Sequence, residues 1–325
     1  MSEDEKLPGW VQWQPRPFPD ANLLLLHGPH PALVDTGFVG HADQTREWAE
    51  THADARIGLV VNTHWHSDHV GGNAALQATG AEIAASAHDA DAVQRRDPGC
   101  CVAEYLDQPV APYTVDRALH DEETLALGEA DWQVIRTPGH TPGHLSLWQP
   151  DEGVLVVGDA LSDYDVGWIA AALDGPDAAG TAVASLDRLD ALAPRVLLPA
   201  HGRMPADPAA ALAKARQRAQ RLVDDPEGAV WYGARRIFSY ALMIRGGLPP
   251  DTVEDYLLAR AWLTDAAAQL DRSASDLAAE LVDTMRRSGA VVEQDGRLRA
   301  AAEATPVAPE TLEQPWPRDW PGRTS

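Results

Sequence analysis

Lysine, cysteine and long apolar runs are scarce in this 325-residue chain. Lys6 and Lys214 are the only lysines, and Cys100 and Cys101 are the only cysteines. Two adjacent cysteines cannot build a disulfide scaffold, and they lack the C-x-x-C spacing of a cysteine metal site. The longest obvious aliphatic run, residues 23–26, is far too short to cross a bilayer. These absences exclude a disulfide-stabilised scaffold and give no sign of a membrane-spanning segment.

Positive charge is also in short supply. Asp and Glu number 49 against 26 Lys and Arg, so the formal net charge is −23. Such a field repels phosphate backbones and anionic lipid surfaces, so we expect neither a nucleic-acid nor a membrane partner. Residues 1–6 are acidic, where a secretory signal would begin with basic residues. We therefore expect a cytoplasmic protein.

Short apolar segments alternate with amphipathic ones over the first two thirds of the chain. Residues 57–62 are apolar and β-branched, which is typical of a strand buried on both faces. Further strands are predicted at 23–26, 32–34, 81–85, 132–136, 145–148, 154–157 and 196–198, and helices at 43–51, 89–96 and 181–192. This mixture predicts an α/β or α+β architecture around one central core.

The C-terminal part has a helical texture. Asp207-Pro208 predicts a helix N-terminus, and more helices are expected at 233–245, 252–261 and 275–287. A hairpin with Asp295-Gly296 in its turn follows, so the order is typical of a winged helix. Helix 275–287 lacks the basic surplus of a DNA-reading helix. We expect this unit to cover the edge of a functional site or to support a homodimer.

These patterns divide the chain into four parts. We predict an N-terminal extension at 1–17, a large α+β domain at 18–206, a winged-helix-like domain at 207–302 and a tail at 303–325. The tail is rich in proline and contains Trp316 and Trp320. Such a composition predicts a segment that is disordered or lies extended over the surface.

Histidines gather directly after the predicted strand 57–62. His64, His66 and His69 stand there with Asp68, and Gly71-Gly72 allows a tight turn behind them. Imidazole nitrogens and carboxylate oxygens are ligands that suit zinc and similar divalent ions. Three histidines and one aspartate at these offsets arise by chance in roughly one such chain per thousand. The pattern therefore predicts a metal site at the end of this strand.

Three further predicted strands end in a side chain that can bind a metal. His140 lies in the sequence TPGHTPGH, Asp159 in VGDA and His201 in LPAHG. Loops at the carboxyl ends of strands can converge on one place. We therefore expect these three residues to join the histidine cluster.

The ordered set HWHSDH, TPGHTPGH, VGDA and LPAHG resembles the metallo-β-lactamase superfamily over residues 18–203. The resemblance implies a four-layer αββα sandwich, of class α+β, with the site at one edge of two sheets. It implies one ion on His64, His66 and His140, a second on Asp68, His69 and His201, and Asp159 as the bridging ligand. Asp35, in LVDTG, would brace these ligands from behind.

The implied ions point to hydrolysis. Two divalent ions, with zinc expected and iron or manganese as alternatives, lower the pKa of a shared water toward ~7, so that a bridging hydroxide can attack a carbonyl. Asp68 would orient the nucleophile or pass a proton to the leaving group. The sequence thus predicts a binuclear metallohydrolase for an ester, thioester or lactone of a small molecule.

Subgroups of the superfamily differ from this chain at particular places. Zinc β-lactamases of the largest subclass have cysteine in place of Asp159, and flavodiiron proteins have glutamate in place of His66. Hydroxyacylglutathione hydrolases share the ligands, but their glycine- and arginine-rich stretch is missing from 161–165. The bulk resemblance is to acyl lactonases and to hydrolases with a winged-helix-like tail. A mononuclear iron persulfide dioxygenase, a phosphodiesterase or nuclease, and a non-catalytic scaffold stay open as alternatives.

Weaker signals surround these motifs. His144 is predicted to hydrogen-bond within its loop rather than to bind a metal. Tyr164 and Trp168 follow Asp159 closely and are candidates for lining a substrate pocket, although packing explains them as well. Residues 99–113 form a candidate lid.

Overall fold

Short apolar segments form two mixed β-sheets in the computed structural model, which describes residues 7–97 and 99–314. The first sheet has the strand order β1-β2-β3-β4-β5-β6 and the second has the order β11-β10-β9-β8-β7. The strands of the first sheet are β1 (Val11–Gln14), β2 (Leu23–Leu26), β3 (Ala32–Val34), β4 (Leu59–Val61), β5 (Glu82–Ser86) and β6 (Arg117–Leu119). Those of the second are β7 (Thr124–Leu127), β8 (Ala130–Arg136), β9 (Leu145–Gln149), β10 (Val154–Gly158) and β11 (Val196–Pro199).

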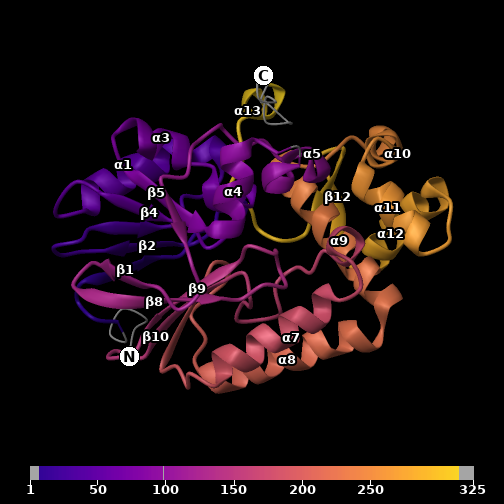
Figure 1. Cartoon of the computed structure of the whole chain (residues 1–325). Coiled ribbons are helices and arrows are strands. Elements are labelled where there is room, and N and C mark those ends of the chain that lie inside the picture. Colours follow the sequence, from indigo (N-terminus) through magenta and orange to yellow (C-terminus); the bar gives the residue numbers. More distant parts are fainter. Residues whose placement is uncertain (1–6, 98, 315–325) are drawn as a thin grey trace.

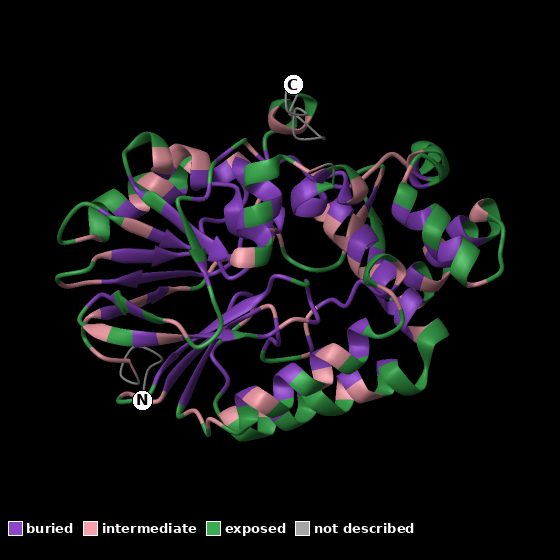
Figure 2. Ribbon diagram, in the orientation of Figure 1, coloured by how far each residue is buried: buried purple, intermediate pink, exposed green. Residues whose placement is uncertain are grey.

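The strand β2 shows how the core is built on both faces of a sheet. Leu24 and Leu26 belong to the apolar cluster between the two sheets, whereas Leu23 and Leu25 pack in the cluster that includes helix residues. This split follows from the strand geometry, because successive side chains point to opposite faces. Figure 2 shows buried residues along most of the central strands, with exposed residues gathered mainly on the outer helices and loops.

Helices cover the outer face of each sheet, which gives four layers (Figure 1). The first sheet is covered by α1 (Ala42–His52), α3 (Asn73–Ala78) and α4 (Ala87–Arg95), and the second by α7 (Ala178–Asp190) and α8 (Pro208–Asp224). The shorter α2 (Ser67–Val70), α5 (Ala103–Leu106) and α6 (Ala171–Asp174) lie in the connecting loops. The predicted αββα sandwich of class α+β is confirmed.

The N-terminal extension and helix α8 (Pro208–Asp224) both pack against the sandwich, although the sequence pattern places them outside the large domain. The predicted extension 1–17 contains β1, which pairs with β2 as the edge strand of the first sheet. Helix α8 was assigned by sequence to the C-terminal unit, but Leu212 and Ala215 pack in the same cluster as Leu186 of α7. This packing favours a domain boundary near 225, at the start of α9, over one at 207.

A helical unit follows α8, and its apolar cluster also takes in Val102, Leu106, Trp168 and Ala170 of the connecting loops. It contains α9 (Pro226–Ile244), α10 (Val253–Leu258), α11 (Ala261–Gln269), α12 (Ala274–Arg287) and the hairpin of β12 (Val291–Gln294) and β13 (Arg297–Ala300). The predicted helix 252–261 is shorter than expected, and α11 was not predicted, because its alanine-rich sequence lacks a clear cap. No comparison identifies this unit as a winged helix, so that interpretation stays a prediction.

The described part of the tail is ordered rather than free. It contains the short helix α13 (Pro309–Glu313), and Ala304 forms a parallel bridge with Phe18. Trp316 and Trp320, the tryptophans of the tail that is expected to be disordered or to lie extended over the surface, fall outside the described residues. None of the helices in the described ranges has the length and apolar character needed to cross a bilayer.

Candidate metal centre

The predicted ligands come together at the carboxyl-terminal edge of both sheets. His64 to His69 follow β4, His140 follows β8, Asp159 follows β10 and His201 follows β11. Within each sheet the local pairing is parallel for β3–β4 and for β10–β11, so these strands end at the same edge. The structure therefore brings all seven predicted ligands into three groups that share His64 and His69.

Three imidazoles form the first cluster. His64 Nε2 lies 3.0 Å from His66 Nδ1, His66 Nδ1 lies 2.9 Å from His140 Nε2, and the two Nε2 atoms of His64 and His140 are 3.0 Å apart. Nitrogens bound tetrahedrally to one zinc at 2.0–2.1 Å stand roughly 3.3 Å apart. Three nitrogens this close to one another cannot all share hydrogen bonds, but they suit a common cation.

The second cluster contains Asp68, His69 and His201. Nε2 of His201 lies 3.0 Å from Asp68 Oδ2, and Nε2 of His69 lies 3.8 Å from the same oxygen. Among the described residues, His69 Nε2 is a buried nitrogen with no hydrogen-bond partner. A buried polar atom without a partner is costly unless a ligand satisfies it.

Asp159 stands between the two clusters. Its Oδ1 lies 3.7 Å from His69 Nε2 and 3.6 Å from His201 Nε2, and its Oδ2 lies 3.3 Å from His140 Nε2. One carboxylate oxygen thus faces each cluster. Although burial favours the neutral acid, His201, His140 and His69 hold the pKa of Asp159 below its ordinary value, so it is a carboxylate at neutral pH.

Burial keeps the first cluster neutral. It lowers the pKa of His64, His66 and His140, and neighbouring imidazoles lower the pKa of His64 and His66 further. Neutral imidazole is the form that binds a metal. Neutral nitrogens beside a fixed carboxylate are therefore a donor set that fits divalent ions.

Asp35 fixes the orientation of His69. Its Oδ2 accepts hydrogen bonds from His69 Nδ1 at 2.7 Å and from Thr63 Oγ1 at 2.8 Å, and its Oδ1 accepts one from the Thr63 backbone N–H at 2.8 Å. Burial opposes a charge on His69, but Asp35, Asp68 and Asp159 outweigh it and raise the pKa of His69 to about 10. Nδ1 keeps its proton for the bond to Asp35, so an ion at the second cluster would take the place of the proton on Nε2 of His69.

Two more contacts hold the ligand loops. Nδ1 of His140 lies 2.5 Å from the carbonyl oxygen of Trp168, which leaves Nε2 for the cluster. His144 Nδ1 is bonded to Thr137 Oγ1 at 2.8 Å, and its Nε2 accepts the backbone N–H of Asp159 at 3.0 Å. Both ring nitrogens of His144 are used in this way, and burial lowers its pKa to about 3. His144 therefore orients Asp159, as the loop interpretation of the sequence predicts.

A cavity of about 440 Å³ opens on the clusters. Asp68, Asp159 and His201 line it together with Tyr164 and Trp168, the two residues predicted to line a substrate pocket. A second cavity of about 390 Å³ lies next to the first, and His66, His140 and Trp168 line both cavities. Apolar walls with a few convergent polar groups are typical of small-molecule sites.

The C-terminal unit supplies one wall of the larger cavity. Helix α9 contributes Arg236, Ile237, Ser239, Tyr240 and Met243. Tyr240 donates its hydroxyl hydrogen to the carbonyl of Pro19 at 2.8 Å, so α9 is tied to the sandwich beside the clusters. The expectation that this unit covers the edge of the site agrees with these contacts.

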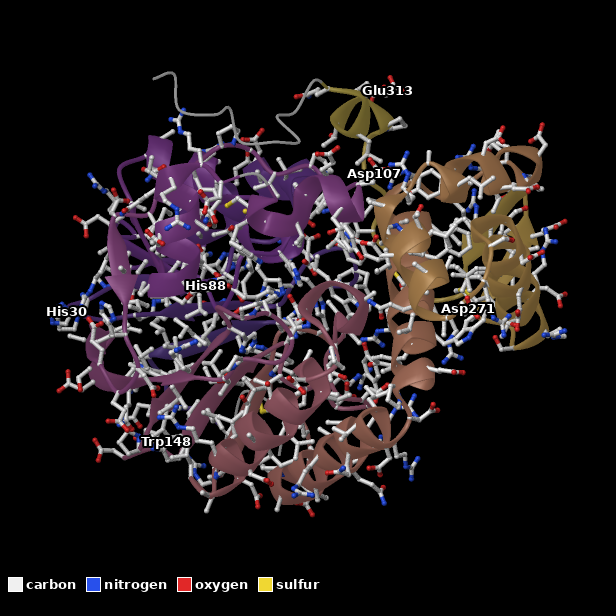
Figure 3. All side chains as sticks on the ribbon, turned by 45° about the vertical axis from the view of Figure 1, so that its right-hand side comes forward. His30, His88, Asp107, Trp148, Asp271 and Glu313 are labelled. Atoms are coloured by element: carbon white, nitrogen blue, oxygen red, sulfur yellow. The ribbon has the colours of Figure 1, made fainter. Side chains whose placement is uncertain are left out.

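The candidate lid 99–113 also joins the sandwich to α9. Leu106 and Gln108 line the larger cavity, and Tyr105 lines the second. Asp107, which Figure 3 labels, forms ion pairs with Arg245, the residue that follows α9, and, at 2.8 Å, with Arg260. Movement of this segment stays a prediction.

Sequence reasoning missed Phe18 and the residues of α9. The ring of Phe18 stacks on that of His201, with centroids 4.7 Å apart and an interplanar angle of 18°. Nothing local marks Phe18 as a site residue. The spacing of Tyr232, Arg236 and Tyr240 places one polar and aromatic stripe on α9, and that stripe was the available signal.

Comparisons with known proteins agree with this geometry. The family model described as "Metallo-beta-lactamase superfamily" matches residues 19–201, more than half of the chain. A hydroxyacylglutathione hydrolase of Methylococcus capsulatus is 36% identical over 149 residues, 44% of this chain and 48% of that protein. One of Hyphomonas neptunium is 38% identical over 106 residues, 32% of this chain and 34% of that protein. The alignments thus span about half or less of these curated relatives.

A solved structure extends the likeness to the C-terminal unit. The crystal structure of a metallo-beta-lactamase family protein from Thermus thermophilus is 25% identical, with a TM-score of 0.53, and the match covers 90% of this chain and 99% of that one. The family match, the two packed sheets and the clusters at their edge lead to one conclusion: the chain belongs to the metallo-beta-lactamase superfamily.

Proposed function

We propose that this chain is a binuclear metallohydrolase that cleaves a thioester, ester or lactone of a small molecule. The observation that carries the proposal is the position of Asp159, whose two carboxylate oxygens face different clusters. A bridging carboxylate favours two ions over one. The relatives named hydroxyacylglutathione hydrolase make thioesters the first substrates to test.

The ligand assignment is part of the proposal. One ion would be held by His64, His66 and His140, and the other by Asp68, His69 and His201, with Asp159 shared. Zinc is the expected metal because the donors are imidazoles and carboxylates, which iron and manganese also accept. When bound, two such ions supply Lewis acidity that acidifies water and polarises an acyl carbonyl.

The chain's own residues prepare the site for this chemistry. Asp35 and the carbonyl of Trp168 fix the imidazoles of His69 and His140, so their ligand nitrogens need no rearrangement. We assign to Asp68, which lines the cavity, the transfer of a proton from the attacking water to the leaving group. Phe18, Trp168 and α9 enclose the acyl group and limit the access of water.

Metal content and turnover test the proposal. The protein is purified without added metal or chelator, its metals are counted, and thioesters, esters and lactones are assayed. We expect close to two zinc or manganese ions per chain and hydrolysis within this panel. One iron per chain with oxygen consumption on a persulfide would contradict the proposal, and so would a chain that binds no metal after reconstitution.

Matched histidine variants sharpen this test. His66→Ala removes a first-cluster nitrogen, so it should abolish hydrolysis and release metal. His120→Ala changes an exposed histidine outside the clusters and should alter neither. Full activity in His66→Ala would disprove the metal mechanism.

A further inference from the structure

Arg236 is the one lysine or arginine that lines the larger cavity among the described residues. The carbon at the centre of its guanidinium lies 5.9 Å from the ring centroid of Tyr164 and 5.6 Å from that of Tyr232. Two aromatic rings thus hold a permanent positive charge beside Asp159, on the wall formed by α9.

This charge lacks the carboxylate partner that comparable arginines have. Arg218 lies 3.4 Å from Asp165, and Arg245 and Arg260 both pair with Asp107. Among the described residues, no carboxylate oxygen lies within 4.0 Å of the Arg236 guanidinium, although acids exceed bases by 23 in the chain. Asp165 and Asp159 attract this half-buried cation only from a longer range, so a carboxylate in direct contact would stabilise it further in a largely apolar cavity.

We propose that Arg236 binds a carboxylate of the substrate and selects acyl compounds that carry one. The inference rests on the proposed hydrolysis and names its substrate class: a thioester or ester with a negative group a short chain away from the scissile bond. Arg236 lies outside residues 19–201, which the family model matches, so the inference depends on contacts in this chain alone.

The chemistry of guanidinium supports a carboxylate as its partner. The group is planar and presents five N–H donors that match two carboxylate oxygens. Its contacts with Tyr164 and Tyr232 are with the rings, and a hydrogen bond to the Tyr164 hydroxyl uses one donor. Most of the donors therefore remain for a ligand in the cavity that Arg236 lines.

A pair of esters tests the selection. The 4-nitrophenyl monoester of glutaric acid and 4-nitrophenyl valerate have acyl chains of the same length, and only the first ends in a carboxylate. A charge-assisted hydrogen bond contributes about 10- to 100-fold. We expect Arg236→Met to lower the ratio of kcat/KM for the charged over the neutral ester by about that factor, and Arg236→Lys to restore part of it.

The neighbouring arginine provides the control. Arg235 donates to the carbonyl of Trp231 and does not line the cavity. Arg235→Met makes the same change in net charge and should leave the ratio as in the wild type. An unchanged ratio in Arg236→Met, or an equal fall in both variants, would overturn the proposal.

Direct binding separates this inference from the proposed function. Calorimetric titration of the metal-loaded protein with glutarate and with butyrate compares a two-carboxylate with a one-carboxylate ligand. We expect tighter binding of glutarate in the wild type and loss of that preference in Arg236→Met. Such a result without hydrolysis of any thioester, ester or lactone would refute the hydrolase and keep the carboxylate site. An absence of glutarate preference in the wild type would refute the site.

Discussion

Replacing Asp35 by asparagine should weaken the second cluster while sparing the first. Asp35 accepts three hydrogen bonds, two from Thr63 and one from His69 Nδ1. If the asparagine oxygen keeps the bond to the Thr63 N–H, its amide NH₂ faces His69 Nδ1. That nitrogen must then accept, so Nδ1 loses its proton and the remaining ring proton stays on Nε2, the atom that faces Asp68 and Asp159.

The size of the effect follows from these contacts. Loss of a residue that orients a metal-bound histidine costs about 10- to 100-fold in metal affinity. Loss of a hydrogen bond to a buried charge costs about 1.5–3 kcal/mol of unfolding free energy. We therefore expect Asp35→Asn to keep the ion on His64, His66 and His140 and to lose the other at a lower chelator concentration.

Chelator titration with metal analysis measures this difference, and Asp20→Asn is the matched control. Asp20 also accepts hydrogen bonds from a histidine, His41 Nδ1 at 2.6 Å, and from a backbone N–H, that of Phe38 at 2.8 Å. Asp20→Asn should therefore lower stability by a similar amount without changing metal affinity. Two ions bound as tightly in Asp35→Asn as in the wild type would refute this account of His69.

Two other predictions concern stability. A Cβ at Gly71 would clash with the backbone of Phe38 and Val39, so Gly71→Ala should lower the unfolding free energy by at least about 3 kcal/mol. Gly180 in α7 has open space around it, so Gly180→Ala should be neutral or stabilising by about 0.5–1 kcal/mol. Denaturant unfolding compares the two variants, and equal effects would contradict the packing argument. Burial and the nearby Arg16 oppose a charge on His41, but Asp20 outweighs them and raises its pKa, so its stabilisation is complete below about pH 6.5 and is lost as pH rises through the raised pKa. The stability difference between wild type and Asp20→Asn should narrow as the pH rises above about 6.5, and a constant difference would mean that His41 is not charged.

The metal clusters could be predicted from sequence because their signals are local. Each ligand follows a short apolar strand, and glycine or proline marks the loop, so His140, Asp159 and His201 could be placed at strand ends from the residue pattern. The ligands meet because these strands end at the same edge of their sheets, as the parallel pairings of β4 with β3 and of β10 with β11 require.

The substrate wall could not be predicted in this way, because it depends on packing between distant segments. Phe18 and His201 are 183 positions apart, and only the closed sandwich stacks their rings. On α9, Ser239 lines the cavity while the adjacent Phe238 lies in the apolar core, and helical periodicity alone does not separate the two environments. The assignment of α8 to the C-terminal unit shows the same limit, since a helix pattern does not reveal which sheet the helix covers.

The bridge between Phe18 and Ala304 has a consequence for anyone who shortens or tags this protein. Thr305 donates to the Phe18 carbonyl at 2.5 Å, and Nε2 of His41 lies 3.1 Å from the Pro306 carbonyl oxygen. A chain that ends at residue 303 would lose these contacts of residues 304–306. It would therefore lose the support for Phe18, whose ring stacks on that of His201. Cloning designs should therefore keep residues through at least 307 and leave Phe18 internal to any fusion.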